Sequence, residues 1–276
     1  MNGARGAGRE ARDVGRGTRG AEGAGGAERD HYSYSVYADP AMAERFERLR
    51  FGGPIGRLLA ETQARQILDG LSPIAGRRVL DVGTGTGRAA IALARAGAVV
   101  TGIDASREML AVAERRAREE GASVTFTRGD AHRLDFADGS FDAVVCLRVL
   151  MHTPDWRASL RELCRVAAWR VVFDYPSLFS AAAIEAAVRR VTHRFDPAVE
   201  AYRVFAPASV SRVLDAAGFR VLAAHRQFVL PIAIHKRLDS VRFTNAVEGL
   251  FRSARLMRLF GSPITVIAER DRRHGA

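Results

Sequence analysis

The sequence predicts an α/β fold in which a mostly parallel sheet carries helices on both faces. Short apolar runs of strand length alternate with stretches of helical periodicity through the middle of the chain, which indicates repeated βαβ units. A glycine-rich turn joins the first of these strands to its helix, as in nucleotide-binding α/β domains. Because parallel strands need long crossover connections, this alternation favours helices packed on both sides of one sheet.

The first half of the predicted sheet lies between residues 78 and 127. We expect strands at 78–82, 99–103 and 124–127, with helices at 88–96 and 107–120 between them. Ser106 precedes the second helix and is a suitable N-cap, because its hydroxyl can accept a backbone hydrogen bond of the first turn.

The second half begins with a mostly apolar strand at 141–147, which is typical of a central strand buried on both faces. A helix follows through Val166, with Pro154 expected at its first position. The remaining expected elements are a strand at 170–174, a helical or irregular stretch at 175–203, a helix at 207–217 closed by Gly218, a strand at 219–229, a long amphipathic helix at 236–260 and a final strand at 263–269.

Composition sets limits on the class of protein. The chain has 276 residues, of which 47% are hydrophobic and 26% charged, as is ordinary for a globular protein. Its two cysteines, Cys146 and Cys164, do not build a disulfide framework, so we expect a reduced, cytoplasmic setting. The 42 basic and 31 acidic residues give a net charge of +11, but the two signs alternate along most helices, which disfavours a nucleic-acid partner.

The turn after the first strand reads Asp81-Val82-Gly83-Thr84-Gly85-Thr86-Gly87. Glycines at such a turn let the backbone approach a ligand without Cβ clashes. The dinucleotide pattern is G-x-G-x-x-G, and here the third glycine, Gly87, comes one residue early. The loop holds no lysine, which excludes a P-loop nucleotide hydrolase. By itself the loop indicates only a nucleotide-like ligand.

Four segments together resemble a known family. Residues 79–87 resemble motif I of the class I S-adenosylmethionine (SAM)-dependent methyltransferases. The segments Gly102–Ser106, Gly129-Asp130-Ala131 and Phe141–Cys146 are similar to the ends of that family's second and third strands and to its fourth strand. The overall pattern is most similar to small-molecule methyltransferases of the ubiquinone/menaquinone-biosynthesis type. The resemblance implies a Rossmann-like seven-stranded sheet of order 3-2-1-4-5-7-6, with the last strand antiparallel, and SAM as the cofactor.

Composition and the resemblance together indicate a domain organisation. We expect a disordered Gly/Arg-rich tail over 1–30, an N-terminal helical lid over 31–75 and a SAM-binding methyltransferase domain over 76–276, with a helical substrate insert at about 175–205. Within the lid, Tyr32, Tyr37 and Arg50 are candidates for contact with cofactor or substrate, with core packing as the rival interpretation.

Carboxylates at the strand ends would hold the cofactor. Asp104 lies about 20 residues past the loop, where a carboxylate can accept both ribose hydroxyls. The family implies that Asp130 and Ala131 contact the adenine and that Asp81 orients the loop or reaches the methionine amino group through water. Asp81 as a loop cap, Asp104 as a surface carboxylate and Asp130 as a turn residue remain the rival readings. The predicted cofactor-binding set is Asp81, Gly83, Thr84, Gly85, Gly87, Asp104, Ala105, Met109, Asp130, Ala131 and Leu147, and no metal ligands are identified.

Catalysis needs little machinery, because the SAM sulfonium is already an excellent leaving group and the protein supplies mainly orientation. His152 is the candidate general base if the acceptor must lose a proton, with a packing role as its rival. Arg148 can meet the SAM carboxylate or an acidic substrate, or form a structural salt bridge. Asp174 and Tyr175, at the end of a strand, can bind the acceptor or simply form a turn.

The acceptor is the open question. The expected helix at 236–260 places Leu238, Val241, Val247, Leu250, Phe251, Ala254 and Met257 on one face and several arginines elsewhere. Such a helix either packs on the sheet or makes peripheral membrane contact in the service of a lipid-like acceptor. The leading hypothesis is a methyltransferase acting on a small-molecule or lipid-like acceptor. A noncatalytic SAM-binding protein and a nicotinamide-dependent oxidoreductase are the alternatives, and the sequence leaves the oligomeric state open.

Overall fold

The computed structural model describes residues 40–195 and 202–271. Within them one sheet has the strand order β3-β2-β1-β4-β5-β7-β6, and β7 runs antiparallel to both of its neighbours. This confirms the predicted fold class and strand order. The strands are β1 (Arg78–Val82), β2 (Val99–Asp104), β3 (Val124–Arg128), β4 (Phe141–Cys146), β5 (Ala167–Tyr175), β6 (Phe219–Phe228) and β7 (Ser262–Arg270).

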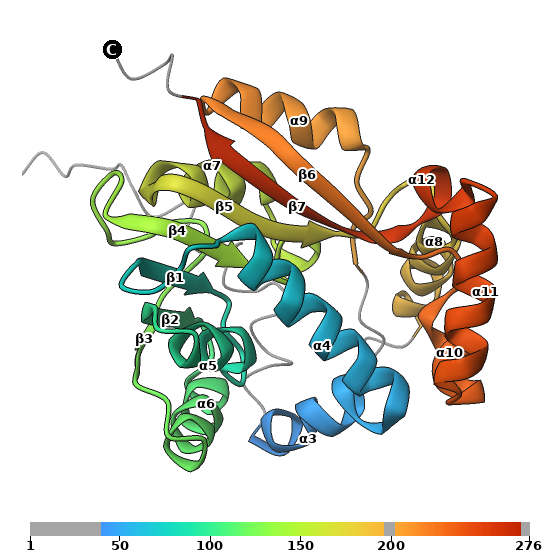
Figure 1. Ribbon diagram of the computed structural model, residues 1–276, viewed down its shortest axis with the longest axis horizontal. Helices are drawn as coiled ribbons and strands as arrows, with labels where there is room; N and C mark the ends of the chain where they lie inside the picture. Colours follow the sequence, from blue (N-terminus) through green and yellow to red (C-terminus); the bar gives the residue numbers. More distant parts are fainter. Residues whose placement is uncertain (1–39, 196–201, 272–276) are drawn as a thin grey trace, which may run out of the picture.

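Helices cover both faces of the sheet (Figure 1). They are α3 (Pro40–Phe51), α4 (Gly53–Gly70), α5 (Arg88–Arg95), α6 (Arg107–Glu119), the short 3-10 helix η1 (Leu150–His152), α7 (Trp156–Val166), α8 (Ala181–His193), α9 (Pro207–Ala216), α10 (Ile232–Leu238), α11 (Val241–Ser253) and α12 (Leu256–Phe260). One core cluster joins α7 and α9 to the sheet, and a second joins α4 and α5 to its other face. None of the helices in these described ranges is long and apolar enough to cross a bilayer.

Two helix starts test the predicted caps. The Ser106 hydroxyl accepts the Met109 N–H at 3.0 Å, as expected for the N-cap of α6. The expectation that Pro154 begins the next helix is wrong, because the Asp155 carboxylate caps α7 by accepting the N–H groups of Arg157 and Ala158 at 3.0 and 3.1 Å. Pro154 therefore lies just outside the helix.

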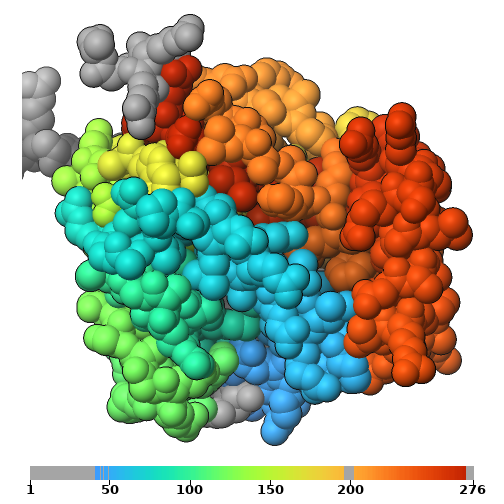
Figure 2. Space-filling view, in the orientation of Figure 1, coloured from blue at the N-terminus to red at the C-terminus, as the bar shows by residue number. Residues whose placement is uncertain are grey.

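The expected long helix at 236–260 is also wrong. This segment forms parts of three helices, which are interrupted where Asp239 and Arg255 adopt left-handed backbone angles, with φ of 43° and 60°. The Ser240 hydroxyl accepts the Phe243 N–H at 3.3 Å and starts α11 anew. Side-chain to backbone bonds of this kind compete with helix continuation. In Figure 2 the resulting α10, α11 and α12 lie together on one side of the molecule, where α10 and α11 contact α4.

Helix α11 packs against the rest of the molecule through a buried polar cluster and not through the apolar face that the sequence predicted. His235 bridges the Thr244 hydroxyl and the Glu248 carboxylate, both at 2.9 Å. Glu248 also accepts the backbone N–H groups of Val229 and Leu230. Leu250, which the sequence places on the packed face, is 67% exposed. Hydrogen-bond satisfaction of buried polar groups therefore sets the orientation of this helix.

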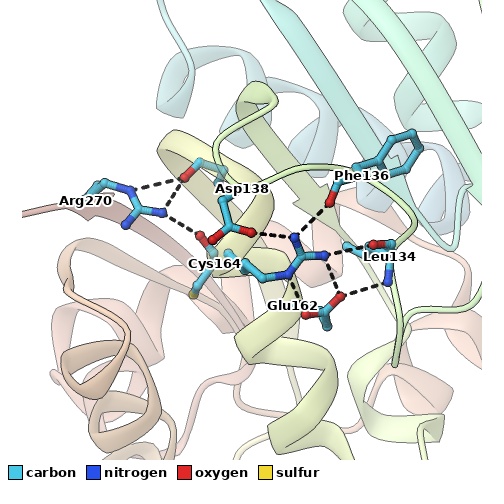
Figure 3. A network of polar contacts seen from close by, with 8 residues as sticks. Leu134, Phe136, Asp138, Glu162, Cys164 and Arg270 are labelled. Carbon is cyan, nitrogen blue, oxygen red and sulfur yellow. Dashed lines mark hydrogen bonds and ion pairs between the residues drawn. The ribbon is translucent and has the colours of Figure 1, made fainter. Parts of the chain in front are cut away.

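Arg165 fixes the connection that leads into β4, and its partners Leu134, Phe136, Asp138 and Glu162 are labelled in Figure 3. Its guanidinium pairs with Glu162 and Asp138, each at 2.7 Å, and donates to the carbonyls of Leu134 and Phe136. This one side chain therefore pairs with two carboxylates and satisfies two backbone acceptors.

Replacing Arg165 by leucine should lower the free energy of unfolding by about 2–4 kcal/mol, because a guanidinium with several charge-assisted bonds is lost and Glu162 keeps only the Leu134 backbone N–H as a partner. The change is measured by urea denaturation. Arg161→Leu, one turn earlier on α7, is the matched control, since Arg161 is exposed and bonds to no described residue. Equal stability of the two variants would contradict the structural role of Arg165.

Candidate functional site

The glycine loop between β1 and α5 forms the floor of a cavity at the carboxyl edge of the sheet. Gly83, Gly85 and Gly87 all have positive φ angles, of 67°, 55° and 81°. A Cβ on Gly83 would lie 2.2 Å from the Val149 side chain, whereas a Cβ on Gly85 would meet nothing within 4 Å. Gly83 thus permits close packing below the loop, and Gly85 leaves open space above it.

The carboxylate of Asp104, at the end of β2, ties the loop to the sheet. One oxygen accepts the Gly85 N–H at 2.8 Å and the other accepts the Ser106 N–H at 2.9 Å. Burial raises the pKa of this carboxyl, and the backbone bonds oppose the shift. Each carboxylate oxygen can accept a further hydrogen bond, so Asp104 retains capacity for two hydroxyls of a ligand.

Asp81 lines the cavity and is 2% exposed. It accepts the Thr84 hydroxyl at 2.7 Å. Desolvation by burial raises its pKa to about 6, against the lowering effects of the Thr84 bond and of the nearby Arg88 charge. The carboxyl therefore titrates close to neutral pH, and a cation in the cavity would favour its ionised form.

Arg88, the first residue of α5, is a cavity residue that the sequence analysis missed. Its guanidinium lies 4.0 Å from the centre of the Phe51 ring and donates to the Gln63 side-chain oxygen at 2.9 Å. The signal for it was an arginine directly after the last glycine of the loop, because side chains in the first turn of a helix point back toward the loop.

Asp130 and Ala131, after β3, line the opposite end of the cavity. Asp130 accepts from the backbone and the ring of His132, both at 2.9 Å. The other ring nitrogen of His132 faces the Asp155 N–H at 3.3 Å and must be the acceptor there, so the Nδ1 hydrogen points to Asp130. His132, also missed from the sequence, therefore fixes the Asp130 carboxylate.

Helix α3 covers the cavity through Glu47. Its carboxylate accepts the Thr86 hydroxyl of the glycine loop and pairs with Arg116 of α6 at 3.2 Å. Arg50 and Phe51, at the end of α3, line the cavity as well. The other two lid candidates, Tyr32 and Tyr37, lie outside the described residues.

Most of the residues predicted from the sequence come together around this cavity. Those that line it are Asp81, Gly83, Thr84, Gly85, Asp104, Ala105, Met109, Asp130, Ala131, Leu147, Arg148 and His152. Gly87 does not line it, because its α-carbon faces the helix packing, where a Cβ would lie 3.0 Å from Ala113.

The residues predicted to contact the methyl acceptor lie in two layers, one lining the cavity and one behind its wall. Arg148 and His152 form the cavity wall after β4. Asp174, 1% exposed, lies behind that wall and accepts the Arg148 N–H at 2.6 Å, which supports the left-handed backbone of Arg148 (φ 62°). Tyr175 is buried and packs against Phe205, with ring centres 5.5 Å apart. Asp174 is therefore placed to shape the wall from behind.

The central part of the chain is similar in sequence to known proteins. A family model described as a methyltransferase domain matches residues 79–168. A methyltransferase from Streptomyces halstedii is 36% identical over 140 residues, which are 50% of this chain and 47% of that protein. A ubiquinone biosynthesis O-methyltransferase from Ralstonia nicotianae is 39% identical over 134 residues, 46% of this chain and 56% of the relative. The chain thus matches about half the length of these curated relatives.

Among solved structures, magnesium protoporphyrin IX methyltransferase from Synechocystis with bound SAH (S-adenosylhomocysteine) superposes with a TM-score of 0.62. The alignment covers 87% of this chain and 98% of that one, at 18% sequence identity. A likeness at that identity establishes the fold. Residues 79–168 therefore match a methyltransferase domain, and the chain around them has the fold of the solved methyltransferase structure.

Proposed function

We propose that this chain is a SAM-dependent methyltransferase that acts on a small-molecule acceptor. The observation that carries the proposal is the Asp104 carboxylate, which holds the glycine loop open and keeps accepting capacity toward the cavity. The donor set fits SAM: Asp104 would hold the ribose hydroxyls, Asp130 and the Ala131 amide the adenine, and Asp81 the methionine ammonium. The matched methyltransferase relatives support the same cofactor.

When bound, SAM supplies a methyl group on a positively charged sulfur that leaves as a neutral thioether. The protein's part is to align an acceptor atom with that methyl and to exclude water. In this proposal Leu147 and Arg148 form the wall beside the acceptor, and Arg148 attracts an acceptor that carries negative charge. His152 removes a proton from acceptors that need it, and Asp174 and Tyr175 act from behind the wall.

Two alternatives make different predictions. A noncatalytic SAM-binding protein would bind SAM and transfer its methyl group to no acceptor class offered. A nicotinamide-dependent oxidoreductase is disfavoured by the early Gly87 and by the methyltransferase domain match. It would be stabilised against heat by NADH and not by SAM.

We further propose that the acceptor is lipid-like and that the chain meets a membrane surface through α8. Ile184, Val188, Val191 and Phe195 recur at the spacing of one helical face and are between 58% and 84% exposed. Arg190, His193 and Arg194 follow at the end of the helix, so the apolar face is bordered by groups that suit anionic headgroups.

The same helix is linked to the cavity wall. The Tyr202 hydroxyl donates to the Ala182 carbonyl at 3.3 Å, and Arg203 donates to the Thr153 carbonyl at 2.8 Å. Thr153 lines the cavity next to His152. An apolar acceptor held at α8 would therefore be near the proposed site of methyl transfer.

Asp104→Ala should weaken SAH binding about 100-fold or more, because two hydrogen bonds to a charged group are lost and the loop loses its anchor. Titration calorimetry measures the change. The control is Asp142→Ala on β4, whose carboxylate also accepts a backbone N–H, that of Arg78 at 2.7 Å, outside the cavity lining. Unchanged affinity in Asp104→Ala would remove the ribose assignment.

Asp81→Asn should make the ligand-free protein more stable near neutral pH. Folding raises this pKa from 3.8 to about 6, so the folded state binds the proton more readily and stability falls as the pH rises through that window. Asparagine does not ionise and avoids this loss. The free energy of unfolding of the variant should therefore exceed that of the unaltered chain by about 2 kcal/mol at pH 7.5, with no gain at pH 4. Denaturant unfolding at the two pH values measures it; a gain that did not depend on pH would contradict the buried-carboxyl account.

Val188→Asp should reduce binding to vesicles of anionic phospholipid about tenfold, since burial of one such side chain is worth about 1.5–3 kcal/mol. Co-sedimentation provides the measurement. Ala208→Asp makes the same charge change at an exposed position of α9 and should leave vesicle binding unaltered. Equal binding of both variants, or no binding by the unaltered chain, would rule out α8 as the membrane contact.

A further inference from the structure

A second cavity in the described part of the chain is a groove of about 760 Å³ between α7 and α9. It is lined by Asp138 and Gly139 before β4, by Ala168 at the start of β5 and by Arg270 at the end of the antiparallel β7. These positions place the groove at the amino ends of the parallel strands, whereas the cavity of the glycine loop lies at their carboxyl ends. No described residue lines both cavities, so the groove is a separate candidate site.

Arginines dominate the lining of this groove. Arg157, Arg161 and Arg165 recur every four residues along α7 and therefore lie on one face of that helix. Arg212 comes from α9, and Arg270 from the end of β7. Like charges four residues apart destabilise a helix, so the stripe on α7 is unfavourable unless an anion offsets it.

The carboxylates near the groove are committed to other partners. Asp138, the one acidic side chain among the described lining residues, pairs with Arg165 at 2.7 Å, and so does Glu162. Asp155 caps the start of α7 through its side chain. Asp215 of α9 lies outside the lining. The groove therefore keeps a surplus of positive charge.

Two of the five arginines form a fixed base. Arg270 donates to the carbonyls of Cys164 and Ala167 at 2.8 Å, and Figure 3 shows it beside Cys164. Arg165 is held by its two carboxylates and two carbonyls. Because most of their N–H groups are occupied, these two side chains add positive potential to the groove and leave direct contact with a ligand to the others.

The other three, Arg157, Arg161 and Arg212, are exposed, and no carboxylate of residues 40–195 and 202–271 lies within ion-pair distance of them. The Arg157 guanidinium lies 4.5 Å from the centre of the Trp156 ring. Arg212 donates to the Ser209 hydroxyl at 3.4 Å and to a carbonyl of its own helix. These contacts restrain two of the side chains and leave several N–H donors unused, which lowers the entropic cost of binding a ligand.

We propose that this groove binds a soluble ligand with two or more phosphate groups, which Arg157, Arg161 and Arg212 contact. A guanidinium binds phosphate through two parallel hydrogen bonds, and three guanidiniums without carboxylates suit an anion of several charges. Apolar side chains, among them Val213 and Ala217, line the same groove and can receive the organic part of such a ligand. The proposal does not depend on the proposed methyl transfer.

The position of the groove favours a dissolved ligand over a lipid headgroup. Helix α8, the proposed membrane contact, follows the carboxyl end of β5, whereas the groove lies at the amino end of that strand. The nine residues of β5 separate its two ends by about 25–30 Å. A bilayer at α8 would therefore leave the groove open to the solvent.

Titration calorimetry of the full chain with inorganic pyrophosphate tests the proposal, at about physiological ionic strength. Pyrophosphate should bind at one site per chain. Inorganic phosphate should bind about tenfold more weakly or less well still, because it offers fewer oxygens and charges to three guanidiniums. Absence of pyrophosphate binding, or equal affinity for the two anions, would overturn the proposal.

Variants connect the binding to the groove. Arg161→Gln should weaken pyrophosphate binding about tenfold, and its combination with Arg212→Gln about 50-fold or more. Arg161→Lys keeps the charge without the planar fork and should restore only part of the affinity. Urea denaturation should show Arg161→Gln to be as stable as the unaltered chain, so that a loss of binding is not a loss of folding.

The matched control is Arg118→Gln, which makes the same charge change at an exposed position of α6 outside both cavities. It should alter pyrophosphate binding less than about twofold, because exposed charges at a distance are screened by salt. Equal losses in Arg118→Gln and Arg161→Gln would mean that the anion senses only the net charge of the chain, and the groove would be dismissed as a site.

Two other sources of phosphate are separated by the same double variant, Arg161→Gln with Arg212→Gln. Its binding to vesicles that contain phosphatidic acid should equal that of the unaltered chain, and a loss there would assign the groove to lipid headgroups instead. A short single-stranded RNA should bind no more tightly than pyrophosphate. Tighter RNA binding that the double variant abolishes would make the groove a nucleic-acid surface and overturn the assignment to a small ligand.

Discussion

The cavity depends on one carboxylate. Asp104 receives a backbone N–H from the glycine loop and another from Ser106, and Ser106 in turn caps α6. Three elements that are separate in the sequence, the loop after β1, the end of β2 and the start of α6, are thereby held as one unit. Because the same carboxylate anchors the glycine loop and lines the cavity, Asp104 cannot be exchanged without altering both.

Local patterns predicted the fold well, and long-range contacts explain where they did not. The strands follow from apolar runs, and the turns follow from glycines, so both are readable from neighbouring residues. The three helices α10 to α12 were read as one because their residues have continuous helical periodicity. The interruptions come from left-handed Asp239 and Arg255, and the packing comes from His235, whose partner Glu248 lies in another helix. Apolar periodicity carries no information about such a buried polar network.

The candidate site shows the same division. The glycine loop and the strand-end aspartates line the cavity as predicted, because the strand edge fixes their position. Arg88, His132 and Glu47 were missed, since each acquires its place from a partner far along the chain. Gly87 entered the predicted set through its place in the motif, yet its contacts are with Ala113 and Phe126, so its glycine character serves helix packing.

The contact of Glu47 with Thr86 joins α3, which forms the roof of the cavity, to the glycine loop, which forms its floor. Because one carboxylate on α3 touches the glycine loop and Arg116 together, displacing the roof also removes a support from the loop. If SAM binds in this cavity as proposed, a displacement of α3 would weaken the hold of the glycine loop on the cofactor at the same time as it uncovered the cavity.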